Sequence, residues 1–237
     1  MKAIILAAGR GSRMRNLTDE NPKCLVLLRG KSLLDWQLEA LRGAGIKQIS
    51  IVTGYKRELL LDKGLKEFNN NRWMLTNMVR SLMCADSWLS KTTCIVSYSD
   101  IFYSSDAVKL LIESNHYLAI TYDPKWKNLW TRRFDNPLID SETFKIDENN
   151  KITEIGNKPL SLDEVQGQYM GLLRFTPRSW LCVKKIILEK TTNEIDKIDV
   201  TSLLQDIIND GEIKIAGIPY QGEWGEFDSE KDLNLFN

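Results

Sequence analysis

A short run of small residues near the N-terminus has the composition of a phosphate-binding turn. Residues 6–13 read LAAGRGSR and directly follow an apolar stretch. Small side chains let backbone N–H groups approach a phosphate closely, and the two arginines add positive charge. The alternative is a plain glycine turn between a strand and a helix, because a lone G-x-G pattern matches many such turns. The candidate phosphate-binding residues are Leu6, Ala7, Ala8, Gly9, Gly11, Ser12 and Arg13.

A lysine follows this turn after one short loop, in the dipeptide Pro22-Lys23. From that place its ammonium group can reach back to an α-phosphate, where negative charge builds as the phosphorus becomes five-coordinate. An isolated lysine is usually solvated surface. The glycine turn and the downstream Pro-Lys together are much more specific than either alone. The two features together predict a site for the phosphates of a nucleotide.

An acidic residue, Asp100, follows the apolar run at residues 93–98. Ligands of open α/β sheets bind at the carboxyl ends of the strands, which is where this residue is expected. The alternative is an ordinary cap or turn residue. Asp100 is thus a candidate residue of a ligand site at this edge of the sheet.

The elements that must position these residues alternate between strands and helices. Lys2–Leu6 and Ile46–Val52 are apolar runs rich in β-branched residues and predict buried strands. Between them, Ser32–Gly43 has helical spacing of its leucines, with Ser32 as the expected N-cap. Strand, turn, helix and strand in this order are typical of a βαβ unit with a parallel sheet.

The alternation continues, which predicts an α/β fold with a Rossmann-like, doubly wound and mainly parallel sheet flanked by helices. Residues 125–158 change in character and predict a small antiparallel β insertion, or lid, within a single domain of residues 1–237. The further helices are expected at Lys56–Asn69, Asn77–Leu89, Ala107–Glu113 and Asp199–Ile208, and the further strands at Thr93–Tyr98, Leu118–Tyr122, Tyr169–Phe175 and Ile213–Ile218.

Composition excludes several other classes of protein. Lys and Arg number 32 and Asp and Glu also 32, so no net charge favours nucleic acid or an anionic membrane as a partner. No apolar stretch is long enough to span a bilayer, and no signal peptide is recognised. The four cysteines and one histidine form no zinc or disulfide pattern. We therefore expect a cytoplasmic protein.

Taken together, the glycine turn, Pro22-Lys23 and Asp100 resemble the signature of bacterial nucleotidyltransferases that join a nucleoside triphosphate to a phosphorylated small molecule and release pyrophosphate. The resemblance extends over nearly the whole chain and implies a nucleotide-diphospho-sugar transferase-like fold. It also implies that Gly9, Gly11, Arg13 and Lys23 contact the nucleotide.

The same resemblance identifies Glu226-Phe227-Asp228 as a second acidic motif. Mg²⁺ takes oxygen ligands and usually binds one or two carboxylates together with substrate phosphates. Asp100 and Asp228 would then be the Mg²⁺ ligands. The implied catalytic residues are Arg13, Lys23, Asp100 and Asp228.

A second phosphate site is expected for the acceptor. Lys158 lies where sugar-nucleotide members of the family carry E-K-P, although Asn157 replaces the acidic residue. Arg132 and Arg133 could bind a carboxylate through bidentate pairs, or they could belong to the packed stem of a hairpin. The expected acceptor-binding residues are Arg132, Arg133, Lys158, Gln168, Gly171, Trp224 and Glu226.

The segment from Asn77 to Leu82 resembles an N-x-x-x-S-L element of cytidylyltransferases, which implies CTP as the nucleotide and adds Asn77, Ser81 and Ser99 to its site. A capped helix N-terminus explains Asn77 equally well. Within that branch, residues 97–101, 129–138 and 168–172 are most similar to the phosphoglutamine cytidylyltransferases of bacterial capsule phosphoramidate synthesis. The implied product is CDP-L-glutamine.

Several alternatives stay open at this point. Within the CTP branch, the acceptor could be phosphocholine or a phosphonate. A sugar-1-phosphate nucleotidylyltransferase shares the expected fold and metal. A nucleotide-binding regulatory module without turnover belongs to another class, and the presence together of Lys23, Asp100, Lys158 and Asp228 argues against it. Oligomeric state is open as well, and a homo-oligomer is possible.

Overall fold

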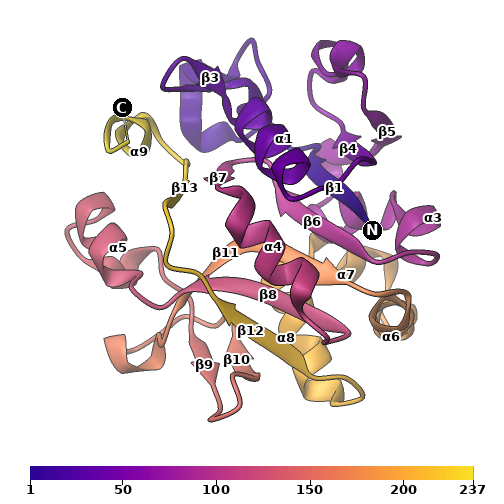
Figure 1. The fold of residues 1–237 in the computed structure, drawn as a ribbon, viewed down its shortest axis with the longest axis vertical. Coiled ribbons are helices and arrows are strands. Elements are labelled where there is room, and N and C mark those ends of the chain that lie inside the picture. Colours follow the sequence, from indigo (N-terminus) through magenta and orange to yellow (C-terminus); the bar gives the residue numbers. More distant parts are fainter. Residues whose placement is uncertain (237) are drawn as a thin grey trace.

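A computed structural model describes residues 1–236, apart from the side chains of residues 15 and 16. Its centre is a seven-stranded sheet in the order β12-β8-β11-β6-β1-β4-β5 (Figure 1). Strand β11 pairs antiparallel with β6 and β8, while the other neighbouring strands pair in parallel. The predicted mixed, mainly parallel α/β sheet is therefore confirmed. Its strands are β1 (Lys2–Ala7), β4 (Ile49–Thr53), β5 (Lys66–Asn69), β6 (Cys94–Tyr98), β8 (Leu118–Asp123), β11 (Gln168–Phe175) and β12 (Ile215–Pro219).

Helices cover both faces of the sheet. Successive residues of a strand point to opposite faces, and the central strands are apolar on both, so each face needs a layer of helices to bury it. In β1, Ala3 and Ile5 join the hydrophobic cluster that contains the apolar faces of α1 (Leu33–Gly43) and α4 (Ser105–Glu113). Their neighbours Ile4 and Leu6 join the cluster on the other face. Figure 1 shows α1 and α4 in front of the sheet. The other face is covered by α2 (Met78–Met83), α3 (Asp86–Leu89), α6 (Pro177–Leu188), α7 (Thr192–Lys197) and α8 (Val200–Asp210).

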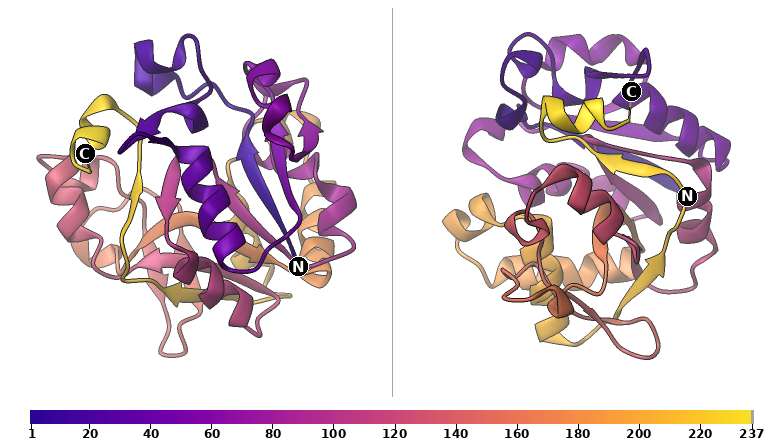
Figure 2. Two further views of the ribbon diagram at one scale, coloured as in Figure 1. Left: turned by 45° about the horizontal axis from the view of Figure 1, so that its top comes forward. Right: turned by 90° about the vertical axis from the view of Figure 1, so that its left-hand side faces the viewer.

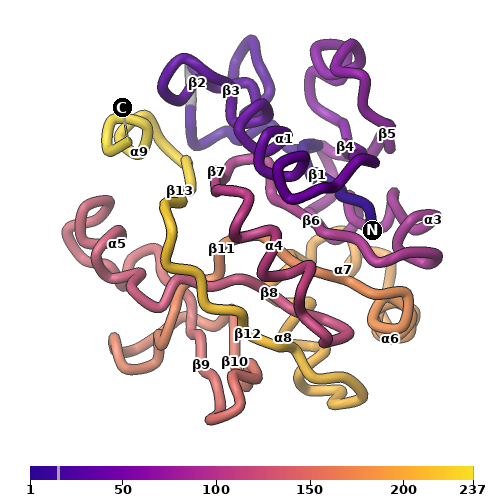
Figure 3. Tube along the Cα trace, in the orientation of Figure 1, coloured from indigo at the N-terminus to yellow at the C-terminus, as the bar shows by residue number. Residues whose placement is uncertain are grey.

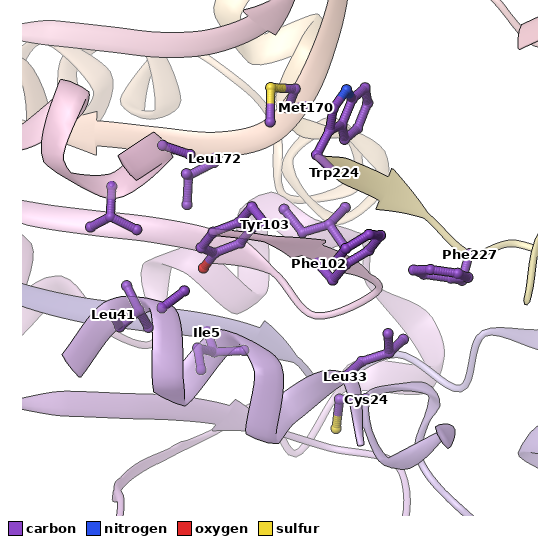
Figure 4. Close-up of a cluster of buried hydrophobic side chains, with 14 of the residues drawn as sticks. Ile5, Cys24, Leu33, Leu41, Phe102, Tyr103, Met170, Leu172, Trp224 and Phe227 are labelled. Atoms are coloured by element: carbon purple, nitrogen blue, oxygen red, sulfur yellow. The ribbon is translucent and has the colours of Figure 1, made fainter. Parts of the chain in front are cut away.

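The cluster on the α1 side reaches from the sheet to the turn that carries Lys23. Figure 4 shows Leu33 of α1 above Cys24, with Phe102 and Phe227 close to this end of the cluster. Cys24 is 1% exposed and Phe227 0% exposed, so both are anchored in the core. Burial of the residues beside Lys23 and Asp228 therefore fixes the backbone of both.

Short elements complete the fold at the edges of the sheet. Strand β7 (Ile101–Tyr103) pairs antiparallel with β13 (Trp224–Glu226), and β2 (Leu27–Leu28) pairs with β3 (Lys31–Ser32). Helix α9 (Glu230–Asn234) follows β13, and Figure 2 shows this C-terminal segment, drawn in yellow, beside α5 (Lys127–Arg133). In the tube trace of Figure 3, β2 and β3 lie at the same end of the molecule as α9. There the Arg29 Nε donates to the Phe236 carbonyl at 2.6 Å.

Three predictions about elements need correction. Residues 56–69 form two 3-10 turns, η3 (Arg57–Leu59) and η4 (Leu61–Lys63), and then the edge strand β5, so the predicted helix is wrong. Pairing of β5 with β4 outweighs the local helical pattern, and Gly64 at φ 66° separates the turns from the strand. The helix predicted at 77–89 is divided into α2 and α3.

The segment 125–158 contains the predicted antiparallel pair, β9 (Phe144–Ile146) with β10 (Ile152–Ile155). It begins, however, with helix α5 and not with a strand. The buried residues Trp126, Leu129, Trp130 and Arg133 follow the i, i+3, i+4, i+7 spacing of one helix face. Among residues 1–236, no helix is long and apolar enough to cross a membrane.

Candidate active site

The ammonium group of Lys23 lies between the carboxylates of Asp100 and Asp228. Its Nζ donates to Asp100 Oδ2 and to Asp228 Oδ1, each at 2.7 Å. Burial opposes the charge on Lys23, but the two carboxylates outweigh this effect and raise its pKa. Burial alone would raise the pKa of Asp228 as well, yet Lys23, Arg13 and Arg133 together lower it. Both shifts favour the charged forms of Lys23 and Asp228.

Backbone pairing brings the two distant carboxylates together. Strand β7 follows Asp100 directly, and its antiparallel partner β13 ends two residues before Asp228. Beyond the strands, the Phe227 N–H donates to the Asp100 carbonyl at 3.0 Å. The two acidic motifs are thus held in register by main-chain hydrogen bonds, which need no particular side chain and leave no signal in the sequence.

A buried glutamine holds the turn that carries Asp100. Gln37, on α1, is 0% exposed, and its Nε2 donates to the carbonyls of Tyr98 and Ile101 at 3.0 and 2.6 Å. The Ser97 hydroxyl donates to the Tyr98 carbonyl at 2.9 Å and accepts from the Tyr103 hydroxyl at 2.9 Å. A buried polar group is costly unless it is hydrogen-bonded, so this network fixes the turn.

The glycine turn after β1 packs directly on the Lys23 side chain. Gly11 has φ 70°, and a Cβ at this position would lie 2.8 Å from Lys23 Cδ. Only glycine satisfies both the backbone angle and the space. The following Arg13 is exposed, and its Nη2 lies 2.9 Å from Asp228 Oδ1. The turn thus places a second cation beside the same carboxylate.

Arg133 supports Asp228 from inside the protein. Its side chain is 0% exposed, with Nε 2.8 Å from Asp232 Oδ1 and Nη1 3.4 Å from Glu226 Oε2. Its Nη2 lies 3.6 Å from Asp228 Oδ2. Asp232 in turn accepts from the Asp228 N–H at 2.9 Å. Arg133 is therefore paired with carboxylates of its own chain, which favours the alternative that it belongs to a packed segment over the expectation that it binds an acceptor carboxylate.

Two adjoining cavities open around these residues and share Arg13, Met78 and Tyr98. The Lys23 cavity has a volume of about 240 Å³, and the acidic cavity has a volume of about 320 Å³. The Lys23 cavity is lined by Leu6, Ala8, Gly9, Gly11, Ser12, Arg13, Lys23, Met78, Ser81, Tyr98, Ser99 and Asp100. The acidic cavity is lined by Arg13, Asn77, Met78, Tyr98, Ile101, Asp140, Glu142, Gln168, Tyr169, Met170, Gly171, Asp199, Thr201, Glu226 and Asp228.

Most of the expected nucleotide-binding residues line the Lys23 cavity. Ala7 does not, because its side chain belongs to the core on the α1 side. Asn77 lies in the acidic cavity, where it caps α2 by accepting from the Met78 N–H and donates to the Lys197 carbonyl at 3.1 Å. The expected residues that line it are Leu6, Ala8, Gly9, Gly11, Ser12, Arg13, Lys23, Ser81 and Ser99, and their contact with a nucleotide stays a prediction.

Only some of the expected acceptor-binding residues line one of the two cavities. Gln168, Gly171 and Glu226 line the acidic cavity, and their contact with an acceptor stays a prediction. Lys158 lines neither cavity and donates to the backbone carbonyls of Leu138 and, at 2.8 Å, Ile139.

Arg132 and Trp224 are also outside both cavities. The Arg132 Nη2 donates to the Leu235 carbonyl at 2.9 Å. Trp224 is buried, stacks on Trp130 and donates to Asp123 Oδ2 at 3.0 Å. Packing of α5 against the C-terminal segment explains both positions, and the expected contact of these two residues with an acceptor stays a prediction.

Carboxylates dominate the acidic cavity, and sequence reasoning did not select three of them. Asp140 and Glu142 come from the segment before β9, and Asp199 is the N-cap of α8. Burial raises the pKa of Asp140 and of Glu142. Burial and the neighbouring Asp228 raise the pKa of Glu226 to about 8. These acids come from three segments that are far apart in sequence, so only the fold reveals them as one group.

Asp100 has one oxygen without a protein partner. Asp100 Oδ1 is buried and accepts no hydrogen bond from the described residues. No group of three or more His, Cys, Asp or Glu side chains within residues 1–236 is arranged to hold a metal ion.

Comparison with known proteins agrees with this architecture. A family model described as the MobA-like NTP transferase domain matches residues 3–143. The CTP:phosphoglutamine cytidylyltransferase of Campylobacter jejuni is 37% identical over 99% of this chain and 98% of its own length.

Two solved structures share the fold at low sequence identity. The inositol-1-phosphate CTP transferase from T. maritima matches with a TM-score of 0.75 and 19% identity, over 98% of this chain and 90% of that one. The CTP:phosphocholine cytidylyltransferase from Streptococcus pneumoniae matches with a TM-score of 0.70 and 21% identity, over 99% and 96%. Because the family model covers more than half of the chain and the C. jejuni relative covers nearly all of it, the protein belongs to the MobA-like NTP transferase family of nucleotidyltransferases.

Proposed function

We propose that this protein is a Mg²⁺-dependent cytidylyltransferase that transfers CMP from CTP to a small phosphorylated acceptor and releases pyrophosphate. The observation that carries the proposal is the position of Lys23 between Asp100 and Asp228, at the boundary of two adjoining cavities. Two substrates that react with each other need two such cavities side by side. The choice of CTP rests on the relative at 37% identity.

The donor set fits Mg²⁺. This ion binds oxygen ligands and is usually held by one or two carboxylates and substrate phosphates, and not by a cage of protein ligands alone. Asp100 and Asp228 supply two carboxylates, and Asp100 Oδ1 is a buried oxygen without a partner. When bound, the ion would neutralise charge on the phosphates.

The residues of the chain supply positioning and positive charge. In the proposed reaction, a phosphate oxygen of the acceptor attacks the α-phosphorus of CTP, and the bond to the leaving pyrophosphate breaks. Lys23, and Arg13 at the junction of the cavities, place positive charge where the α-phosphate gains negative charge. Such transfers depend mainly on positioning and electrostatic stabilisation, so no side-chain nucleophile is required.

The acidic cavity favours an acceptor that carries an ammonium group. Asp140, Glu142 and Asp199 line it, and Arg13 is the single cation among its lining residues. Carboxylates stabilise a cation through charge-assisted hydrogen bonds. The uncharged hydroxyl groups of a hexose 1-phosphate would not offset the electrostatic repulsion between these neighbouring carboxylates. A sugar-1-phosphate acceptor is therefore disfavoured.

L-Glutamine phosphate is the acceptor that we propose, with CDP-L-glutamine as the product. Its amino-acid ammonium group matches the acidic cavity, and the C. jejuni relative carries this acceptor in its name. Phosphocholine and aminoethylphosphonate also carry cationic nitrogen and are the nearest alternatives. A role in capsule phosphoramidate synthesis stays a prediction from the sequence resemblance.

A pyrophosphate-release assay tests the proposal. CTP is combined with phosphoglutamine, phosphocholine, aminoethylphosphonate and hexose 1-phosphates, with Mg²⁺ and with a chelator. We expect release with CTP, Mg²⁺ and phosphoglutamine above the other acceptors. A preference for UTP, dTTP or GTP would overturn the choice of CTP, and a preference for a hexose 1-phosphate would overturn the choice of acceptor.

Substitution of the two acids tests the proposed catalytic centre. Asp100→Ala with Asp228→Ala is expected to lower kcat by about 10³-fold or more, because the charge-stabilising centre is lost. Asp210→Ala is a matched control, since Asp210 is exposed at the C-terminal end of α8. Full pyrophosphate release by the double variant would contradict the proposed mechanism.

A further inference from the structure

The side-chain amide of a buried asparagine next to the Lys23 cavity is held in one orientation by its hydrogen bonds. Asn70 follows β5 directly and is 4% exposed. Its Oδ1 accepts from the Arg72 N–H at 3.1 Å, so its amide nitrogen must face the other way. There Nδ2 donates to Thr76 Oγ1 and to Ser81 Oγ, both at 3.0 Å. Asn70 therefore makes both hydroxyl groups act as acceptors.

The two hydroxyl groups differ in where their own protons go. Thr76 donates to the Arg72 carbonyl at 3.0 Å. Ser81 Oγ is bonded only by Asn70, and no acceptor for its proton is found among the residues that the structure describes. A serine inside a helix often donates to the carbonyl one turn earlier, but here the Asn77 carbonyl does not accept. A hydroxyl group has one proton to donate, so that of Ser81 is available to a ligand.

The position of Ser81 indicates which part of a ligand it faces. The Lys23 cavity has charged lining residues, Arg13, Lys23 and Asp100, which suit the phosphates and the metal. The remaining lining residues of α2 and β1 are uncharged: Leu6, Met78 and Ser81. An uncharged wall with one hydrogen-bond donor suits the base of a nucleotide. Cytosine presents two acceptors, O2 and N3.

We propose that Ser81 donates its hydroxyl proton to a ring acceptor of the pyrimidine base, and that Asn70 is the positioning residue that holds this hydroxyl group as a donor. The inference rests on the proposed function, because it places CTP in the Lys23 cavity. Asn70 itself does not line the cavity and acts through Ser81.

Calorimetric binding of CTP to two single variants tests the contact. Ser81→Ala removes one oxygen, keeps a good helix former, and is expected to weaken CTP binding about tenfold. Asn70→Asp keeps an oxygen that accepts from the Arg72 N–H but replaces the amide nitrogen that donates to Ser81. The Ser81 hydroxyl group would then donate its proton to the new carboxylate. It is expected to weaken CTP binding about as much as Ser81→Ala. Asn71→Asp adds the same charge at an exposed neighbour and should change the affinity less than twofold.

A double variant separates positioning from a general loss of structure or a charge effect. In the Ser81→Ala background, Asn70→Asp should weaken CTP binding less than twofold further, because the hydroxyl group through which it acts is gone. If the loss of CTP affinity in the double variant equals the product of the losses in the two single variants, the two residues act independently, and the role of Asn70 is overturned. In both single variants the loss should fall on CTP affinity more than on kcat at saturating CTP, and a larger fall in kcat would overturn the positioning role.

Binding of dCTP separates the base from the ribose. A contact with the base predicts the same loss for Ser81→Ala with CTP and with dCTP. A loss confined to CTP would assign the contact to the 2′-hydroxyl group and overturn the inference. If the wild-type chain binds no CTP, the proposed function fails as well. If it binds CTP and both single variants bind equally well, only this inference fails.

Discussion

The Lys23 cavity and the acidic cavity adjoin, but the chain builds them in different ways. The Lys23 cavity is formed mainly by backbone turns at the ends of β1 and β6, where small residues leave space and main-chain groups are exposed. The acidic cavity is formed by side chains from separate segments near residues 140, 168, 199 and 226. The Lys23 cavity is thus determined mainly by short stretches of sequence, while the acidic cavity is determined by the tertiary fold.

This difference indicates how each cavity can change. The parallel strands and the Gly11 conformation constrain the Lys23 cavity, because a side chain at Gly11 would collide with Lys23. Asp140, Glu142 and Asp199 of the acidic cavity lie at a helix N-cap and in loops, where substitution disturbs less of the core. We infer that the first cavity sets the reaction and that the second sets the choice of acceptor.

The largest effect is expected for Lys23→Gln. It removes the charge next to the α-phosphate and leaves Asp100 and Asp228 facing each other, so kcat should fall about 10²- to 10³-fold. Initial rates of pyrophosphate release at saturating substrates measure this fall. Lys158→Gln is the matched control, because Lys158 binds loop carbonyls outside both cavities. A larger loss for Lys158→Gln than for Lys23→Gln would reverse the roles of the two lysines.

A smaller effect, on stability, is expected for Gln37→Leu. The carbonyls of Tyr98 and Ile101 would lose their buried donor, which should lower the free energy of unfolding by about 2 kcal/mol. Urea unfolding at one protein concentration measures the change. Gln48→Leu alters an exposed glutamine and should change the free energy by less than about 0.5 kcal/mol. Equal effects of the two substitutions would show that Gln37 does not hold the Asp100 turn.

The same contrast explains what could be predicted from the sequence. The turn at residues 6–13 and Lys23 are close in sequence, and their residue types and spacing specify their chemistry. Most of them lie where they were expected. The strand and helix order was also largely recognisable, because β1, β4 and β6 are continuous apolar runs.

The errors arise where tertiary contacts decide. The buried residues from Trp126 to Arg133 have helical spacing, but the tryptophans and the later hairpin favoured a strand, so α5 was missed. Arg133 then looked like a ligand-binding arginine, although its carboxylate partners Asp232 and Glu226 are about a hundred residues away. Asp140, Glu142 and Asp199 were not selected, because an acid in a loop has no local feature that assigns it to a cavity.

Neutral replacements in the acidic cavity should change acceptor binding alone. Glu142→Gln with Asp199→Asn is expected to raise KM for an ammonium-bearing acceptor about tenfold and to leave KM for CTP within twofold. Asparagine is also a good N-cap, so α8 should remain intact. Steady-state kinetics with each substrate varied in turn measures both constants. An equal rise of the two KM values would contradict separate roles for the two cavities.

The smallest effect is expected for Arg132→Ala. Arg132 is exposed, and its guanidinium binds the Leu235 carbonyl on the side of α5 that lies outside both cavities. KM for the acceptor and kcat should therefore both stay within twofold of the wild type, as is usual for surface substitutions. The adjacent Arg133→Ala is the informative comparison, because it leaves Asp232, Glu226 and Asp228 without their buried cation and should lower the free energy of unfolding by about 3 kcal/mol. A rise in acceptor KM for Arg132→Ala at unchanged stability would instead extend the acceptor site to α5.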